Sequence, residues 1–421
     1  MKAEILAVGS EMLTPDRLDT NSLFLTEELN KLGVEVVRKT IVGDDRELLS
    51  AAFQEALARV PLVVASGGLG PTEDDLTRET LSDLLGRKLR LNEEILNAIK
   101  AKFRSFGREM PEVNVRQAMV PEGAEVLENP RGTAPGRWIE DRGRIVALLP
   151  GPPRELKPLF LEQVVPRLEK RATGVRLHHR ELRVAGMGES HVETRIKSIY
   201  KRFSDVQTTV LATPGEIQIH LRIWTGDSAH AEKTLNELVE GIHLALGERI
   251  FSTDGQSMEE VVARLLTLNI ATIATAESCT GGLLAERLTR IAGSSLYFLG
   301  GVVSYSNELK TAWVDVAADI IQTKGAVSAE VAVALADGIR RRVGSTLGVG
   351  ITGIAGPSGG SEEKPVGTVH VALVHAAGVK EFGRIFPGDR EAIRWHASQM
   401  ALDMVRVHFL YNGSGKNSGR G

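Results

Sequence analysis

The chain has 421 residues, of which 42% are hydrophobic and 25% charged, a balance that excludes a disordered or collagen-like protein. Its 51 Lys and Arg against 54 Asp and Glu give a net charge of −3, so no overall field draws it to nucleic acid or to an anionic membrane. Because Cys279 is the single cysteine, neither an intrachain disulfide nor a cysteine-based zinc site can form.

The amino-terminal sequence predicts neither a signal peptide nor a membrane span. Met1–Leu6 leads directly into a strand-like pattern. The longest apolar runs, near 61–66 and 145–150, are far shorter than the ~20 residues that a membrane span needs. We therefore expect a cytoplasmic protein with no membrane partner.

Residues 1–172 are expected to form the first domain. Short apolar runs alternate there with amphipathic stretches, which favours β-α-β units around a mostly parallel sheet. The pattern predicts strands at 5–8, 34–42, 62–65 and 144–149, and helices at 21–32, 47–60 and 155–165.

Residues 173–250 are expected to form a small α+β domain, with strands at 181–185 and 217–224 and helices at 190–200 and 229–246. A linker is expected at 251–257. Ser257, with Glu260 three residues later, then predicts a capping box at the start of a helix.

The remaining sequence predicts a second α/β domain at 258–411, with strands at 271–276, 298–305, 346–352 and 367–376. The tail at 412–421 contains Gly, Ser, Asn and basic residues without apolar periodicity, and we expect it to be disordered. The fold class is therefore α/β, as two α/β domains with a small α+β domain between them. At about 150 residues per domain, the length agrees with three parts.

The loop Gly67–Thr77 is the densest candidate site of the first domain. Its glycines, including Gly68 and Gly70, let backbone N–H groups approach an anion closely, and it includes Thr72. Asp74 and Asp75 could hold a hard divalent cation, although acidic residues often only cap a helix.

Two further turns should follow strands at the same edge of this sheet, where open α/β folds bind ligands. They are Gly9-Ser10-Glu11 and the Pro150–Glu155 segment. The three loops together favour a ligand that carries phosphate. The loop at 67–77 lacks the third glycine of a dinucleotide-binding fingerprint.

The second α/β domain contains serine, tyrosine and lysine at suggestive spacing. Ala276–Gly282 joins a strand to a helix and forms a cradle for an anion. Its Cys279 is more simply a small buried residue than a nucleophile. Ser295 could instead be activated by Lys310, if burial lowers the pKa of that lysine from about 10.4. Exposed lysines and capping serines are the plain alternative.

The amino-terminal motifs resemble the first domain of the CinA family. They are the Gly67–Thr77 loop, the Pro150–Glu155 turn and Asn129–Ala134. The resemblance implies a fold similar to molybdopterin-binding proteins and metal-dependent hydrolysis of ADP-ribose to AMP and ribose 5-phosphate. It further implies a divalent metal cofactor of the Mg, Mn or Co class, held by Asp74, Asp75, Glu11 and Glu155, with Gly68, Gly70 and Thr72 near the substrate.

The middle segment, with Gly186–Ser190, resembles the small KH-like connecting domain of the same family. A glycine-rich loop between strand and helix raises the possibility of an RNA clamp. No cluster of basic and aromatic residues surrounds this loop, so we favour a structural role and expect no direct nucleic-acid partner.

The carboxyl-terminal motifs resemble the CinA carboxyl-terminal domain and the stand-alone PncC enzymes, which deamidate nicotinamide mononucleotide (NMN) to nicotinate mononucleotide and ammonia. The matching segments are Ala276–Gly282, Ser304–Lys310, Thr352–Pro357, Gly367–Val369 and Phe386–Glu391. The resemblance implies Ser295 as nucleophile, Lys310 as base and Tyr305 as a proton relay, without a metal. It implies a substrate pocket that contains Ser278, Thr280, Gly281, Thr352, Gly353 and Arg390. A surface ion pair of Arg390 with Asp389 or Glu391 is the simpler alternative for that residue.

The resemblance thus implies a hydrolase of pyridine-nucleotide recycling that takes NMN and ADP-ribose, and a homodimer. Two rival interpretations remain open. One is a molybdopterin-binding module that releases no ammonia. The other is an interaction protein of competence or recombination, for which Ser295 would be irrelevant.

Overall fold

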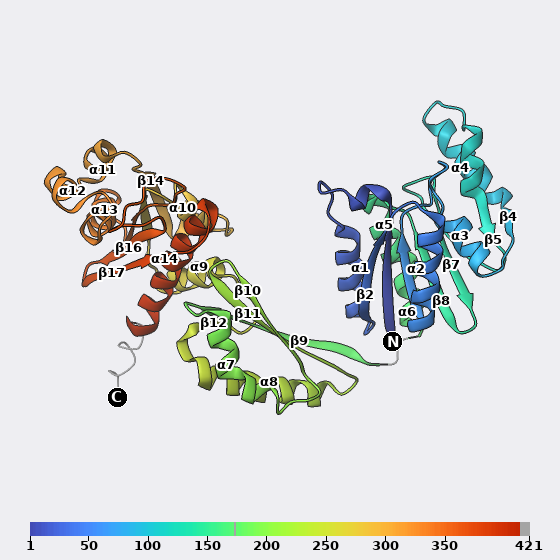
Figure 1. Cartoon of the computed structure of the whole chain (residues 1–421), viewed down its shortest axis with the longest axis horizontal. Coiled ribbons are helices and arrows are strands. Elements are labelled where there is room, and N and C mark those ends of the chain that lie inside the picture. Colours follow the sequence, from blue (N-terminus) through green and yellow to red (C-terminus); the bar gives the residue numbers. More distant parts are fainter. Residues whose placement is uncertain (172–173, 413–421) are drawn as a thin grey trace. The chain divides into compact units, whose positions relative to one another are not determined.

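The computed structural model describes residues 1–171 and 174–412 and divides into two units (Figure 1). One unit comprises Met1–His178 and Trp224–Ala231. The other comprises His179–Ile223 and the chain from Glu232 onward. The expected disordered tail lies outside the described residues from 413 on, whereas Asn412 is the last residue of a helix.

A six-stranded sheet in the order β2-β1-β3-β8-β7-β6 forms the centre of the first unit. The neighbours β2, β1, β3 and β8 pair in parallel, and β7 and β6 complete the sheet with antiparallel pairings. The predicted mostly parallel sheet is confirmed. The strands of this unit, with the separate β4–β5 pair, are β1 (Lys2–Val8), β2 (Glu35–Val42), β3 (Leu62–Ser66), β4 (Leu89–Leu91), β5 (Met119–Pro121), β6 (Glu125–Leu127), β7 (Gly136–Asp141) and β8 (Arg144–Leu149).

Helices cover both faces of this sheet, because its central strands alternate their side chains between two hydrophobic cores. Ile5 of β1 packs in one core, and Leu6 packs in the other. The first core includes residues of α1 and α5, and the second includes residues of α2 and α3. The helices are α1 (Thr20–Lys31), α2 (Arg46–Arg59), α3 (Thr77–Leu84), α4 (Glu93–Ser105), α5 (Pro153–Leu159) and α6 (Val165–Glu169).

The carboxyl ends of β1, β3 and β8 meet at one edge of the sheet. Gly67, directly after β3, donates its N–H to the carbonyl of Leu149 at the end of β8, at 2.9 Å. Its φ of 102° suits glycine, and an added Cβ would lie 2.1 Å from the carbonyl oxygen of Val8 in β1. This close approach requires a glycine, and it brings the loops after the three strands together.

The small domain is a four-stranded sheet in the order β10-β11-β9-β12 with two helices. Its elements are β9 (Arg176–Ala185), α7 (Glu189–Tyr200), β10 (Gln207–Thr213), β11 (Glu216–Thr225), α8 (Ser228–Leu246) and β12 (Ile250–Ser252). Phe251 and Ser252, expected in a linker, belong to β12, which pairs with β9. The irregular segment before the next helix is therefore shorter than the sequence suggested.

The carboxyl-terminal domain has a five-stranded sheet in the order β14-β13-β15-β16-β17. β14, β13 and β15 pair in parallel, and β16 and β17 extend the sheet as antiparallel strands. The strands are β13 (Ile273–Glu277), β14 (Phe298–Val303), β15 (Leu347–Gly353), β16 (Thr368–His375) and β17 (Gly378–Ile385).

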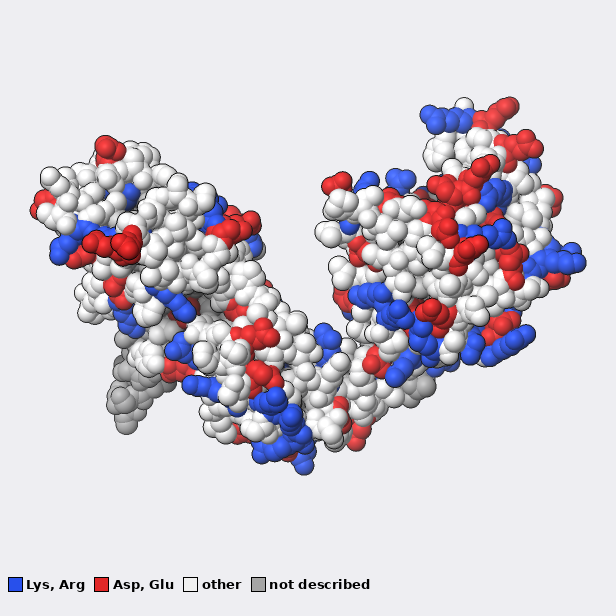
Figure 2. Space-filling view, in the orientation of Figure 1, with Lys and Arg blue, Asp and Glu red and all other residues white. Residues whose placement is uncertain are grey.

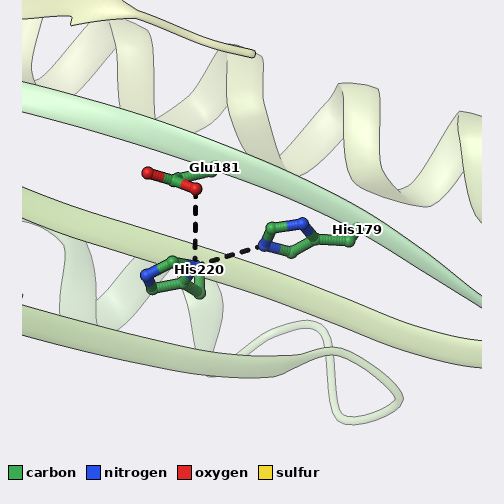
Figure 3. Close-up of side chains that lie close together, drawn as sticks. All are labelled: His179, Glu181 and His220. Atoms are coloured by element: carbon green, nitrogen blue, oxygen red, sulfur yellow. Dashed lines mark hydrogen bonds and ion pairs between the residues drawn. The ribbon is translucent and has the colours of Figure 1, made fainter. Parts of the chain in front are cut away.

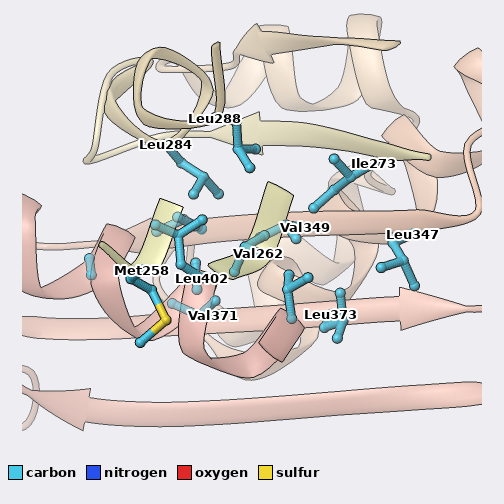
Figure 4. Close-up of a cluster of buried hydrophobic side chains, with 14 of the residues drawn as sticks. Met258, Val262, Ile273, Leu284, Leu288, Leu347, Val349, Val371, Leu373 and Leu402 are labelled. Atoms are coloured by element: carbon cyan, nitrogen blue, oxygen red, sulfur yellow. The ribbon is translucent and has the colours of Figure 1, made fainter. Parts of the chain in front are cut away.

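Helices pack on both faces of this sheet as well. Figure 4 shows the larger core, in which Met258, Leu284 and Leu402 of three helices meet strand residues such as Ile273. Ala274, the next residue of β13, faces the opposite core. The helices are α9 (Met258–Leu268), α10 (Leu283–Thr289), α11 (Asn307–Val314), α12 (Ala318–Lys324), α13 (Ala329–Val343) and α14 (Arg390–Asn412).

The start of α9 agrees with the expectation from the sequence. Ser257 and Glu260 form both hydrogen bonds of a capping box at the start of α9. Within the described residues, no helix combines the length and the apolar character needed to cross a membrane. Acidic and basic side chains lie interspersed on the visible faces of the units (Figure 2), in keeping with the small net charge of −3.

Candidate active site

The carboxyl ends of β13, β14 and β15 form a common edge in the carboxyl-terminal domain. The backbone ladder continues one residue past β13 and β14. Ser278 donates its N–H to Ile351 at 2.9 Å, and Ser304 donates its N–H to Glu277 at 2.9 Å. Ligands of open α/β sheets bind at such an edge. Ser278, Ser304, Tyr305 and Thr352 all lie there by their positions in the strands.

The turn after β13 is held by the buried carboxylate of Glu277. This carboxylate accepts N–H bonds from Gly282, Leu284 and Ala285 at 3.1, 3.1 and 2.8 Å. A carboxylate at the start of a helix satisfies N–H groups that have no partner within the helix. Gly281, with φ of 61°, lets the chain turn sharply here. Glu277 thus fixes the backbone that carries Ser278 and Thr280.

Lys310 is buried in α11, with 2% of its surface exposed. Its ammonium donates to the carbonyl of Tyr305 at 3.1 Å, rather than to a carboxylate. Burial lowers the pKa of Lys310, because desolvation penalises the charged form, and the nearby Cys279 and Glu308 oppose this shift only in part. The structure therefore gives Lys310 the environment that a general base requires.

Tyr305 and Arg390 contact each other at this edge. One guanidinium nitrogen of Arg390 donates to the Tyr305 hydroxyl at 2.9 Å, and another donates to the Gly356 carbonyl at 2.8 Å. No ion pair of Arg390 with Asp389 or Glu391 is found in the described part of the chain. Arg390 begins α14, and its charge is held at the carboxyl edge.

Ser295 lies at the other end of strand β14. It belongs to the 3-10 helix Ser294–Leu296 before this strand, whereas Tyr305 and Lys310 follow it. Because β14 is parallel to β13, Ser295 lies at the amino edge of the sheet and Lys310 at the carboxyl edge. At about 3.3 Å per residue, the strand between them spans roughly 17 Å. The prediction that Ser295 pairs with Lys310 is therefore wrong within one chain.

Four hydroxyl side chains instead lie at the carboxyl edge of the sheet. Thr352 donates its hydroxyl to the Ala326 carbonyl at 2.7 Å. The hydroxyls of Thr280 and Ser304 are buried, and neither has a hydrogen-bond partner among the described residues. Ser278 is the one hydroxyl residue of the turn that keeps some surface, 8%, open. Among these four hydroxyls, that of Ser278 is the best able to meet a substrate.

Cys279, next to Ser278, is a poor nucleophile. Burial raises the pKa of its thiol to about 12, so the thiolate is scarce at neutral pH. A Cβ added to Gly353 at the end of β15 would lie 3.0 Å from the Cys279 sulfur. The thiol therefore packs against the strand, as the simpler interpretation of the sequence predicted.

In the first domain, Asp75 is occupied by its own loop. Its carboxylate accepts from the N–H and the hydroxyl of Thr72 at 2.9 and 2.5 Å. Hydrogen bonds from Thr72 and from the backbone lower the pKa of Asp74. An added Cβ on Gly70 would lie 2.3 Å from Asp75, and one on Gly68 would lie 2.1 Å from the Thr77 hydroxyl. The glycines thus let the loop fold against its own polar side chains.

The four carboxylates predicted to share a metal ion do not form one group. Glu155 accepts from Asn129 at 2.8 Å, and exposed Glu11 folds back over Gly9. Among the described residues, no set of three potential ligand atoms within 4.8 Å of one another includes any of these carboxylates. The predicted four-residue centre is therefore not supported. Asp74 and Asp75, adjacent in one loop, fit a cation that a phosphate ligand shares.

Two residues of these edges were missed from the sequence. Arg394 donates twice to the Thr280 carbonyl, at 3.1 and 2.8 Å, and adds a second positive charge beside Arg390. Its position four residues after Arg390 on the same helix could have indicated it. Lys102 of the first domain donates to the carbonyls of Pro130 and Gly132. No local signal places it near them.

The fold and its edges define a protein with two α/β domains, each with a loop-lined carboxyl edge, joined by a small four-stranded domain. Family models agree with this division. Residues 4–170 match a probable molybdopterin binding domain, residues 179–252 match the damage-inducible protein CinA KH domain, and residues 255–409 match the CinA C-terminal domain.

Full-length relatives give the same result. A CinA-like protein of Koribacter versatilis is 49% identical over 414 residues, which cover 97% of this chain and 100% of the relative. A CinA-like protein of Solibacter usitatus is 50% identical over 406 residues, which cover 96% and 98%. The chain belongs to the CinA family. A crystal structure of the competence/damage inducible protein CihA from Agrobacterium tumefaciens is 40% identical, with a TM-score of 0.35, and the match covers 36% of this chain and 96% of that one.

Proposed function

We propose that the carboxyl-terminal domain hydrolyses the carboxamide of NMN to nicotinate mononucleotide and ammonia. The observation that carries this proposal is the buried Lys310 at a sheet edge that also holds Ser278. Burial lowers the pKa of Lys310, which makes a neutral amine available as a base. The family resemblance supplies the substrate class.

In this mechanism Ser278 attacks the carboxamide carbon, and Lys310 takes the proton from its hydroxyl. Lys310 returns the proton to the departing amine, and ammonia leaves an acyl ester on Ser278. Water then attacks this ester, with Lys310 again as the base, and nicotinate mononucleotide is released. Backbone N–H groups of the turn after β13 stabilise the oxyanion.

Arg390 and Arg394 support a substrate that carries phosphate. Both guanidinium groups are held by carbonyls of the carboxyl edge, and Arg390 also contacts the Tyr305 hydroxyl. Arginine binds phosphate through a planar array of donors. The phosphate of NMN therefore orients the nucleotide, while its carboxamide meets Ser278. Nicotinamide riboside, which lacks this phosphate, should be a poor substrate.

The test is ammonia release from NMN and from nicotinamide riboside, each with and without EDTA. The proposal predicts release from NMN that EDTA leaves unchanged, with kcat/KM at least about ten-fold higher than for the riboside. Cys279→Ala should retain activity, because the thiol takes no part in the reaction. Absence of ammonia from folded wild type would overturn the assignment and favour the interaction-protein alternative.

For the first domain we propose hydrolysis of ADP-ribose to AMP and ribose 5-phosphate. The observation that favours this second activity is the set of glycine-containing loops after β1, β3 and β8, where Gly67 contacts both neighbouring strand ends. Asp74 and Asp75 would hold a divalent cation, which would neutralise pyrophosphate charge when bound. The loop itself orients the phosphates through its backbone N–H groups.

AMP formation from ADP-ribose tests this second proposal. The proposal predicts activity with Mg²⁺, Mn²⁺ or Co²⁺, loss of activity in EDTA, and at least about ten-fold lower activity in Asp75→Asn. The matched control is Asp83→Asn, an exposed carboxylate that pairs with Arg46 elsewhere in this domain. Tight pterin binding without AMP formation would instead support a molybdopterin-binding module.

The family resemblance also leads us to propose a homodimer, which sedimentation tests.

A further inference from the structure

Two histidines and a glutamate meet on one face of the small domain's sheet (Figure 3). His179 and Glu181 are two residues apart on β9, so they point to the same face of the sheet. His220 extends toward them from β11, the neighbouring strand. Neither the sequence motifs nor the proposed activities account for this cluster.

The spacing of the three ligand atoms is close to that of a tetrahedral metal site. Nε2 of His179 lies 3.2 Å from Nδ1 of His220, and this Nδ1 lies 4.0 Å from a carboxylate oxygen of Glu181. Two nitrogens bound to Zn²⁺ at about 2.05 Å in tetrahedral geometry are about 3.3 Å apart. All three ligand atoms lie within 4.8 Å of one another.

The surroundings hold this group in place. The imidazole rings of His179 and His220 stack, with centroids 5.4 Å apart and planes at 11°. The other carboxylate oxygen of Glu181 accepts from Nε of Arg183 at 2.8 Å. Gly255 packs closely against the carboxylate oxygen of Glu181 that faces His220, because a Cβ added to this glycine would lie 3.2 Å from that oxygen. The hydrogen bond from Arg183 orients the carboxylate of Glu181, as such outer hydrogen bonds orient metal ligands.

Several charged groups face the two imidazoles, but burial has the largest effect on their pKa values. Burial lowers the pKa of His179 and of His220, and the positive charge of Arg222 acts in the same direction on both rings. The carboxylate of Glu181 opposes it. Arg180 adds to the effect at His179 and Arg183 at His220.

We propose that His179, Glu181 and His220 bind a divalent transition-metal ion of the Zn²⁺ class, with one coordination position left open. Two imidazoles and one carboxylate suit Zn²⁺ or Co²⁺ better than Mg²⁺, which prefers oxygen ligands. The ion would link β9 to β11 and replace the proton that the two imidazole nitrogens share. It would therefore stabilise the small domain.

The test uses the untagged full-length chain, stripped of metal and titrated with Co²⁺. Four-coordinate Co²⁺ absorbs strongly in the visible range, and Zn²⁺ should abolish this signal by displacement. Wild type should show one such equivalent, and saturating Zn²⁺ should raise its Tm. His220→Ala and His179→Gln should each weaken Co²⁺ binding by at least about one hundred-fold and remove the Tm rise.

Two further variants act as controls. His191→Ala removes an exposed histidine of α7 in the same domain and should bind Co²⁺ as wild type does. Asp75→Asn separates this site from any cation held in the first domain, and it should also keep the signal. Circular dichroism confirms that each variant is folded. The proposal is overturned if folded His220→Ala and His179→Gln keep the Co²⁺ absorption, or if wild type has none.

Discussion

Lys310→Met tests the proposed base with little change in shape. Methionine replaces the buried aliphatic stem of Lys310 and removes the amine that donates to the Tyr305 carbonyl. Because burying an ammonium group costs free energy, the variant should be at least as stable as wild type in urea unfolding. Any loss of activity then reports chemistry and not unfolding.

The expected loss follows from the role of Lys310 as proton acceptor. A positioned general base contributes about 10²–10⁴-fold to the rate. At 1.36 kcal/mol for each ten-fold change, this is about 2.7–5.4 kcal/mol of activation free energy. Since the base must be neutral, kcat/KM of wild type should rise with pH and level off above the pKa of Lys310. Burial places that pKa below its ordinary value of 10.5.

The assay is ammonia release from NMN across pH, with wild type, Lys310→Met and Lys233→Met. The last variant removes a lysine of α8 whose side chain is 77% exposed, and it should match wild type. Lys310→Met should lose both the rate and the pH-dependent rise. If it keeps the wild-type rate and pH profile, Lys310 is not the base and the reasoning from its burial is refuted.

The remaining predictions concern binding and stability. Arg390→Ala should raise KM for NMN by about 10–100-fold with a smaller change in kcat, because it removes a phosphate contact; equal KM values would contradict this role. Glu277→Gln should lower the free energy of unfolding in urea by about 1–3 kcal/mol, because the Glu277 carboxylate accepts three backbone N–H bonds. The control Glu286→Gln, at an exposed position, should change the free energy of unfolding by about 0.5 kcal/mol or less. Burial lowers the pKa of His408 from 6.5 to about 4, so the unfolded chain takes up a proton at this residue before the folded chain does as pH falls. Wild type should therefore lose up to about 3 kcal/mol of its free energy of unfolding between those pH values, and His408→Phe should remove this loss. An unchanged pH dependence of the free energy of unfolding in His408→Phe would contradict this.

Local patterns were sufficient for most of the fold. The sequence predicted a strand at 271–276, and the structure has β13 there, with Ile273 and Ala274 facing opposite cores. The pair Ser257 and Glu260 fixed the start of α9, because a capping box involves only neighbouring residues. β12 was missed at Phe251, since a three-residue strand has too little periodicity to separate from a linker.

The site was harder to predict because it depends on which ends of the strands meet. Lys310 and Arg390, predicted as base and as pocket residue, both contact Tyr305 in the structure. Ser295 was placed with them by the family resemblance, although the strand predicted at 298–305, which contains β14, lies between Ser295 and Lys310. Because β14 pairs in parallel with β13, Ser295 lies at the amino edge of the sheet and Lys310 at the carboxyl edge. This arrangement favours Ser278 as the nucleophile. The four carboxylates predicted as metal ligands form no single group among the described residues, and Asp75 accepts a hydrogen bond from Thr72 of its own loop.

The central claim is that the reaction occurs at the carboxyl edge of the sheet, with Ser278 as nucleophile. The most direct measurement is kcat for ammonia release from NMN by Ser278→Ala and Ser295→Ala, each verified as folded. Ser278→Ala should lose at least about 10³-fold in kcat, while Ser295→Ala stays within about two-fold of wild type. Loss of activity in Ser295→Ala with full activity in Ser278→Ala would contradict the account.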